Sequence, residues 1–167
     1  YIGGAGTQNA GAVFGGAEPS VSNKTEEYDG SSWSAGGTLI TARLNLAKGF
    51  GTQNAAIGAG GTVSDSNGGQ SATEQYDGAS WTNQVSMITP RFYGGAGSVN
   101  AGIKSYGFRN LTYQTINCTE LWNGTSWTEV NDLNEAAGGI SGAGLQPAAF
   151  AVYHNQHEVW NGSSWTE

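Results

Sequence analysis

One seven-residue phrase occurs four times in the chain, and it constrains the fold more than any other feature of the sequence. Each copy contains an aromatic residue, then Asp-Gly or Asn-Gly, then a short run that ends in Trp. Asp-Gly or Asn-Gly between β-favouring runs is the strongest short signal for a β-hairpin. The sequence therefore predicts four hairpins, at residues 27–33, 75–81, 121–127 and 159–165.

The spacing of these copies predicts how the hairpins are combined. Their last residues are separated by 48, 46 and 38 positions and are Trp33, Trp81, Trp127 and Trp165. A second marker, Gly-Thr-Gln-Asn-Ala in its first two occurrences, recurs every 45 to 47 residues, at Gly6, Gly51, Gly97 and Gly144. Two markers that share one period, each flanked by small and β-branched residues, predict four strands per unit. A unit of this kind is the blade of a β-propeller.

We therefore expect an all-β propeller of four-stranded antiparallel blades, without helices, in a single domain that spans residues 1–167. The blades are predicted at residues 1–36, 46–85, 92–130 and 137–167. The strands are predicted at residues 1–7, 9–16, 25–30, 32–35, 47–52, 54–61, 72–77, 80–85, 93–98, 100–107, 115–122, 126–130, 138–144, 148–153, 156–160 and 163–166.

The number of repeats leaves three arrangements of the ring open. Four blades can close a ring by themselves, they can form part of a larger ring, or two chains can associate as a homo-oligomer. The pattern is already under way at Tyr1, which we interpret as a sign of a processed chain or of a longer parent chain.

Composition narrows the classes of partner. The net charge of −7, with no basic patch to offset it, disfavours nucleic-acid phosphate. No apolar run approaches the roughly 20 residues needed to span a bilayer, so membrane insertion is not expected. The single cysteine, Cys118, excludes an internal disulfide framework.

The repeated residues are interpreted as structural. We expect the first turn residue of each hairpin to be chosen for turn geometry, and these residues are Asp29, Asp77, Asn123 and Asn161. The four repeat tryptophans are expected to pack between blades. A glutamate precedes each hairpin at one position per repeat, and such regularity favours a structural role over catalysis. These glutamates are Glu26, Glu74, Glu120 and Glu158.

The residues after the second strand resemble those of the kelch-type β-propellers related to the central domain of galactose oxidase. The resemblance rests on the double glycines Gly15-Gly16 and Gly60-Gly61, each followed by a variable loop, a Tyr and a Trp. It spans the whole chain, but the last two units depart from it, with Tyr106-Gly107 and Tyr153-His154 at the glycine pair. The two markers together also resemble the kelch-like repeats of phage tail-fibre and environmental viral proteins.

The resemblance implies a scaffold that mostly binds proteins or glycans, with a minority of enzymes. A copper oxidase would need imidazole and phenolate ligands at one point, but both histidines, His154 and His157, lie in the last unit. A sialidase-like glycosidase would need an arginine cluster. Arg43 and Arg91 lie at equivalent positions in the connectors between consecutive blades, and we interpret them as joining adjacent blades, while Arg109 lies in a loop. We expect no enzymatic activity, no metal and no cofactor; glycosidase and copper oxidase are the less favoured alternatives.

We expect a recognition module that binds a glycan or a protein receptor through the face that carries the variable loops. Loop aromatics and polar groups suit such a ligand because sugars stack on aromatic rings and accept hydrogen bonds. The residues expected to bind it are Asp65, Asn67, Phe108, Arg109 and Tyr113. The expected setting is an extracellular or virion surface, such as a fibre or adhesin. The alternative is a structural assembly element of a virion or filament.

Overall fold

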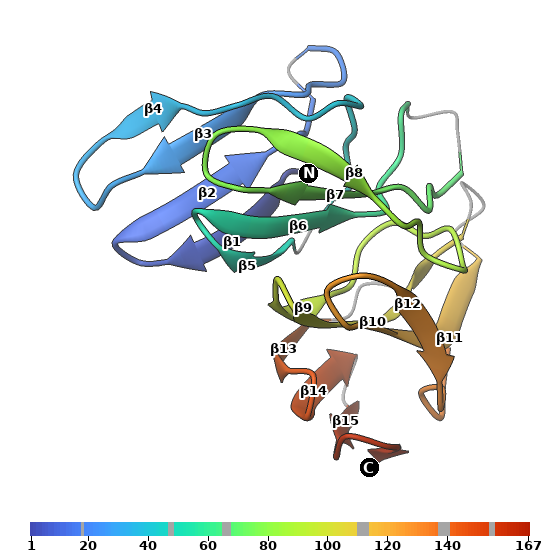
Figure 1. Cartoon of the computed structure of the whole chain (residues 1–167). Helices are drawn as coiled ribbons and strands as arrows, with labels where there is room; N and C mark the ends of the chain where they lie inside the picture. Colours follow the sequence, from blue (N-terminus) through green and yellow to red (C-terminus); the bar gives the residue numbers. More distant parts are fainter. Residues whose placement is uncertain (18, 47–48, 65–67, 110–113, 137–140, 154–155) are drawn as a thin grey trace.

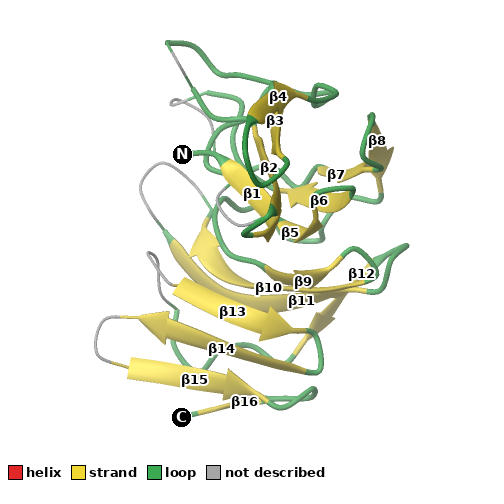
Figure 2. Cartoon of the chain, turned by 90° about the vertical axis from the view of Figure 1, so that its left-hand side faces the viewer, coloured by secondary structure: helices red, strands yellow, loops and turns green. Residues whose placement is uncertain are grey.

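The computed structural model describes all residues except 18, 47–48, 65–67, 110–113, 137–140 and 154–155. The described residues form sixteen β-strands in four antiparallel four-stranded sheets, with no helix among them. These sheets are the four blades of a β-propeller (Figure 1 and Figure 2). The described part of the chain therefore has no helix that is long and apolar enough to cross a membrane.

Each blade uses four consecutive strands, from the innermost to the outermost. Blade 1 contains β1 (Gly3–Thr7), β2 (Ala10–Phe14), β3 (Thr25–Tyr28) and β4 (Trp33–Ala35). Blade 2 contains β5 (Phe50–Thr52), β6 (Ala55–Ala59), β7 (Thr73–Tyr76) and β8 (Trp81–Gln84). Blade 3 contains β9 (Ala96–Ser98), β10 (Ala101–Phe108), β11 (Thr115–Trp122) and β12 (Trp127–Val130). Blade 4 contains β13 (Ser141–Leu145), β14 (Ala148–Tyr153), β15 (Gln156–Trp160) and β16 (Trp165–Thr166).

The predicted fold class is confirmed, and each predicted strand has its counterpart in the structure. The largest differences are at the starts of β5 and β9, which begin at residues 50 and 96 instead of 47 and 93, while the predicted start of β13 at 138 lies outside the described residues. Strand β2 ends at Phe14, before the double glycine, because Gly15 and Gly16 have φ values of 70° and 99°. Left-handed backbone of this kind ends an extended strand, and glycine adopts it without steric cost.

The outer hairpins are closed by a turn that the repeated phrase encodes. In blade 1, Asp29 Oδ1 accepts hydrogen bonds from the backbone N–H groups of Ser31 and Ser32, each at 2.8 Å. A side-chain oxygen that accepts from the backbone two residues on stabilises a turn locally. The same pair of contacts recurs at the equivalent residues of the other blades, Asp77, Asn123 and Asn161.

Three buried clusters form the core, one at each junction between consecutive blades. We call the face of a blade that is turned toward the preceding blade its leading face, and the opposite one its trailing face. At every junction a leading-face tryptophan donates its indole N–H to a threonine Oγ1 on the trailing face of the preceding blade. The pairs are Trp81 with Thr25 at 2.9 Å, Trp127 with Thr73 at 3.0 Å, and Trp165 with Thr119 at 2.9 Å.

The four blades form an arc, and its two outer faces are the leading face of blade 1 and the trailing face of blade 4. Both differ from the faces at the internal junctions. Trp33 is 54% exposed, whereas its counterparts in the later blades are 5 to 6% exposed. The expectation that all four tryptophans pack between blades does not hold for Trp33, because no described blade covers the leading face of blade 1. On blade 4, β14 alternates exposed and buried residues, while β10 is buried at six consecutive positions. Alternation is the pattern of a strand with one face in solvent.

The innermost strands pack side by side in the order β1, β5, β9 and β13. They line an axial hollow of about 440 Å³, and the lining consists of glycine and alanine together with Phe50. Small residues fit here because four strands approach one another closely. Blades 1 and 4 lie at the two ends of this series (Figure 1).

Candidate functional site

Four aromatic side chains meet on the loop face, where the connectors between blades and the loops between second and third strands emerge. The ring of Tyr93 meets those of Tyr1, Phe92 and Phe108 edge-on, with centroids 5.7, 5.3 and 6.0 Å apart. Phe92 and Phe108 also pair through their backbones. We call these four residues the aromatic patch. Phe92 is buried, Tyr93 and Phe108 are half-buried, and Tyr1 is 80% exposed, so the patch presents aromatic surface to solvent.

Backbone hydrogen bonds between successive connectors hold the patch in place. The N–H of Asn45 donates to the carbonyl of Tyr1 at 3.0 Å, and the N–H of Tyr93 donates to the carbonyl of Asn45 at 3.2 Å. The Tyr93 hydroxyl also donates to Asn45 Oδ1 at 3.3 Å. Asn45 and Tyr93 each stand two residues after the connector arginine, Arg43 or Arg91. The patch therefore extends across the entrances of three successive blades.

The backbone at these two positions is strained. Asn45 has a φ of 57° and Tyr93 a φ of 71°. Asparagine tolerates the left-handed region, but a bulky aromatic residue there is an outlier. Such conformations cost about 1 to 3 kcal/mol each and persist where the surroundings impose them, most often at binding and catalytic sites. The strain at Tyr93 is thus a reason to look for function at the patch.

A buried lysine supports Tyr93 from below. Lys104 Nζ donates to the carbonyl of Tyr93 at 3.3 Å and to the carbonyl of Ala59 at 2.6 Å. Its side chain is fully buried, and burial, together with the nearby Arg91 and Arg43 guanidinium groups, lowers the pKa of Lys104 to about 7. Lys104 links the strained connector to blade 2 and does not reach solvent.

The structure places two of the five predicted ligand-binding residues next to the patch. Phe108 belongs to it, and Arg109 follows at the exposed end of β10. The Arg109 carbonyl accepts a hydrogen bond from Gly69 N–H at 2.9 Å, so the variable loops of blades 2 and 3 are adjacent. The other three predicted residues, Asp65, Asn67 and Tyr113, lie outside the described residues.

Sequence reasoning missed the contributions of Tyr1, Asn45 and Tyr93. The usable signal was the alignment of the two connectors on Arg43 and Arg91, which puts Asn45 and Tyr93 at equivalent positions. A large aromatic residue in an otherwise polar connector stands out in that alignment. The backbone hydrogen bond between the two residues depends on how blades pack, and no sequence pattern encodes it.

Three of the four repeated glutamates are buried, Glu74, Glu120 and Glu158, whereas Glu26 of blade 1 is exposed. Arg43 pairs with Glu74 at 2.9 Å and Arg91 with Glu120 at 2.6 Å, and all four side chains are fully buried. Each pair joins a connector to the following blade, in agreement with the role in joining adjacent blades that we inferred for these arginines. Within the described ranges, no three His, Cys, Asp or Glu side chains gather as a metal site would require.

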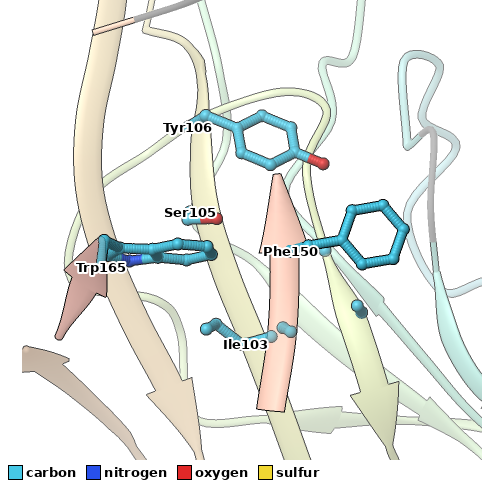
Figure 3. Close-up of a pocket in the computed structure, with 8 residues that line it drawn as sticks. Ile103, Ser105, Tyr106, Phe150 and Trp165 are labelled. Atoms are coloured by element: carbon cyan, nitrogen blue, oxygen red, sulfur yellow. The ribbon is translucent and has the colours of Figure 1, made fainter. Parts of the chain in front are cut away.

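A small cavity lies between blades 3 and 4 (Figure 3). Tyr106 and Trp165 line it, and the ring of Phe150 points away from Trp165 (Figure 3). Its volume is about 10 Å³, which is room for about one water molecule. Burial raises the pKa of Tyr106 to about 12, so its hydroxyl stays neutral. This cavity is an interior void and too small for an organic ligand.

The fold and the patch together define a propeller of four antiparallel blades that exposes aromatic side chains on its loop face. No protein-family model matches the chain, and no curated protein matches it. The kelch-type resemblance of the repeat therefore stays a prediction.

Proposed function

We propose that this protein is a non-enzymatic binding module that recognises a neutral glycan through the aromatic patch, with a protein receptor as the alternative ligand. The observation that carries the proposal is the strained, half-exposed Tyr93, fixed by three aromatic neighbours and by Asn45. Propeller blades supply the rigid support for such a surface, and the loops supply its variation.

The chemistry of the patch suits a sugar. Aromatic side chains combine a large apolar surface with a polar edge, and the C–H faces of a pyranose ring pack on such surfaces. Asn45 and Arg109 supply amide and guanidinium donors for the sugar hydroxyls beside the rings. Because Tyr93 is already held in place, little ordering is required on binding, and this preorganisation favours affinity.

The proposal includes binding without turnover. Its support is that Glu74 and Glu120, the repeated carboxylates with arginine partners, are buried in ion pairs instead of facing the loop surface. It also includes a kelch-type ancestry and an extracellular or virion-surface location. Both rest on the resemblance of the repeat to kelch propellers and to phage tail-fibre repeats.

The test is a glycan array combined with a pull-down screen, using the protein and two variants. Tyr93→Asn removes the ring but keeps a residue that tolerates a positive φ, as Asn45 does at the equivalent position. Leu145→Ala is the control, because Leu145 is an exposed apolar residue in the β13–β14 hairpin, on the opposite face.

We expect Tyr93→Asn to lose binding while its unfolding midpoint is unchanged or higher, and Leu145→Ala to bind normally. Binding that survives Tyr93→Asn would move the ligand site away from the patch. A blank screen together with turnover in a hydrolase or oxidase assay would overturn the proposal.

A second candidate function, an assembly element of a virion or filament, is favoured by the exposed outer faces of blades 1 and 4. Labelling of the native particle distinguishes the two functions. A loop face that is buried against copies of the same protein supports assembly, and a loop face that points outward supports recognition.

A further inference from the structure

The three internal junctions of the arc are built to one design. On the leading face, a tryptophan stacks on the aromatic residue that precedes its turn, as Trp81 does on Tyr76 at 5.0 Å. The same tryptophan contacts the trailing face of the preceding blade, where the ring of Phe14 lies 4.7 Å from Trp81. Its indole N–H then meets a threonine hydroxyl. A leading face therefore brings a ring and a donor, and a trailing face brings an apolar seat and an acceptor.

Blade 1 carries a complete leading face that nothing covers in the structure. Trp33 lies 5.1 Å from Tyr28, in the same place as the Trp81 and Tyr76 pair, yet it is 54% exposed. Among the described residues, none accepts a hydrogen bond from its indole N–H. The face is preformed, because the intrablade stack already fixes Trp33 in the orientation seen at the internal junctions.

Blade 4 carries the complementary trailing face. Phe150, Val152 and Val159 are 41 to 47% exposed there, and they line a shallow apolar hollow of about 480 Å³ with Ala148 and His157. Large apolar residues exposed together, and not singly, mark an interaction surface. Phe150 alternates along β14 with the buried Ala149 and Ala151, and its ring points away from Trp165 (Figure 3).

The strand register matches the two faces to each other. Val152 pairs with His157 as Phe14 pairs with Thr25, so Val152 stands where Phe14 seats a tryptophan. His157 stands where threonine accepts the indole N–H, and a neutral imidazole nitrogen is also an acceptor. The face of Trp33 therefore finds on blade 4 an apolar residue at the position of Phe14, and an acceptor at the position that is used three times within the chain.

We propose that two copies of this chain associate head to tail, with the leading face of blade 1 of each copy seated on the trailing face of blade 4 of the other, to form a closed ring of eight blades. The contact is heterologous, so one copy alone cannot satisfy both of its faces. In this ring of two copies, both outer faces of each chain are buried and every blade has a neighbour on each side. The junction repeats an interface that the chain already forms three times.

The first test is the molar mass in solution at moderate salt, since two chains of net charge −7 repel each other when salt does not screen them. Light scattering during gel filtration is expected to give about 34 kDa, twice the 17.2 kDa of one chain. A mass of one chain from low micromolar up to the highest soluble concentration would overturn the proposal. So would a ladder of species that grows with concentration, because it indicates an open filament.

Single variants locate the interface without endangering the fold. Trp33→Ala removes a side chain that is exposed within one chain, so the blade should stay folded while association weakens at least about 30-fold, the effect of losing an interface hot spot. His157→Thr restores the acceptor of the other junctions and should still dimerise. Val85→Ala is the control: Val85 is an exposed residue just after the outer strand of blade 2, away from both faces, and this variant should dimerise normally. An unchanged mass for Trp33→Ala refutes the assigned faces.

Complementing variants give the sharper test. Trp33→Ala disables only the leading face of blade 1, and Phe150→Arg disables only the trailing face of blade 4. Each variant alone should be monomeric, because every junction it can form contains a disabled face. A mixture should form a one-to-one dimer through its single intact junction. A mixture that stays monomeric would overturn the head-to-tail arrangement. A longer natural chain that shields Trp33 as a monomer would also overturn it, by showing that further blades fill the face.

Discussion

All three junctions contain the repeated glutamate, but the groups that donate hydrogen bonds to it differ between the first two junctions and the third. At the junction of blades 2 and 3, Glu120 accepts hydrogen bonds from the N–H groups of Ile88 and Thr89 and from the Arg91 guanidinium. Glu74 has the matching three donors at the junction of blades 1 and 2.

At the junction of blades 3 and 4, Glu158 accepts from the backbone and side chain of Asn134 and from the Tyr153 hydroxyl at 2.5 Å. A buried cation is thus replaced by a neutral donor from the same blade. The carboxylate needs three donors in each case, and the source of the third one is interchangeable.

The double glycine differs between the same regions, for a connected reason. A Cβ on Gly15 or Gly60 would lie 2.4 or 2.3 Å from the carbonyl oxygen of the connector arginine, Arg43 or Arg91. Glycine therefore lets the arginine-bearing connector approach the blade. Blade 3 has Tyr106 at this position, with a φ of 63°, and its ring is buried in the cluster of the third junction. The third connector has no arginine equivalent to Arg43 and Arg91, and the blade before it has a tyrosine in place of the glycine.

The largest expected effect separates the two kinds of junction. Glu120→Gln leaves the fully buried Arg91 guanidinium without a counter-charge, and stranding a buried charge costs about 3 to 5 kcal/mol of unfolding free energy. Glu158→Gln weakens hydrogen bonds in a site without a buried cation, which costs about 1 to 2 kcal/mol. Urea titration of both variants measures the difference.

The double variant Glu120→Gln with Arg91→Met is the control, because removing the stranded charge should recover part of the loss. Equal costs at Glu120 and Glu158 would show that the ion pair and the neutral network are energetically alike.

The next effect tests the glycine. Gly60→Ala should lower the unfolding free energy by roughly 2 to 4 kcal/mol, because its φ of 79° is strained for alanine and the new Cβ pushes against Arg91. The hydrogen bond from Gly61 N–H to the Arg91 carbonyl, at 3.0 Å, would be strained as well. Gly4→Ala is the matched control, since its Cβ would meet no atom closer than 3.6 Å. A Gly60→Ala protein as stable as Gly4→Ala would contradict this account.

A smaller effect tests the tyrosine that substitutes for arginine. Tyr153→Phe removes one donor to Glu158 and keeps the ring, so we expect a loss of about 1 to 2 kcal/mol by chemical denaturation. Burial, followed by the hydrogen bond to Glu158, raises the pKa of Tyr153 well above its usual value. An acid whose pKa is raised by folding favours the folded state until the pH passes its unfolded value, so wild-type stability should fall above about pH 10. Tyr153→Phe should lose less over the same range.

The sequence was sufficient for the blades because each repeat carries its own local signals. The turn residue Asp29 and the double glycine Gly15-Gly16 place strand ends without reference to the rest of the chain. The candidate site was only partly accessible. Phe108 and Arg109 were named from the third loop, but the position of Tyr93 depends on a hydrogen bond to Asn45 in another connector.

The exposure of Trp33 was also beyond the reach of the repeat. Its local sequence differs from that of Trp81 at only two of seven positions, and both tryptophans stack on a preceding tyrosine. What differs is the presence of a neighbouring blade, a property of the assembled arc. The repeat in the sequence shows which residues each blade contains, but contacts between blades decide which of the equivalent residues are exposed to solvent.

The last prediction concerns Lys104, which blade 3 alone carries, at the position of Val13, Gly58 and Ala151 in the other blades. Folding lowers its pKa from 10.5 to about 7, so between those values the unfolded chain binds more protons than the folded one. Stability should therefore rise with pH from about 7 toward 10, by at most about 1.4 kcal/mol per pH unit.

Lys104→Met removes the titrating group, and its stability should change less over that range than that of the wild type, as measured by urea unfolding at a series of pH values. Below pH 7 the variant should be the more stable of the two with respect to this group, because the wild type carries the full penalty of a buried charge. Parallel curves for the two proteins would mean that the Tyr93 and Ala59 carbonyls stabilise the ammonium group enough to keep its ordinary pKa. Lys104 would then be a third buried cation of the arc, matched by backbone oxygens in place of a glutamate.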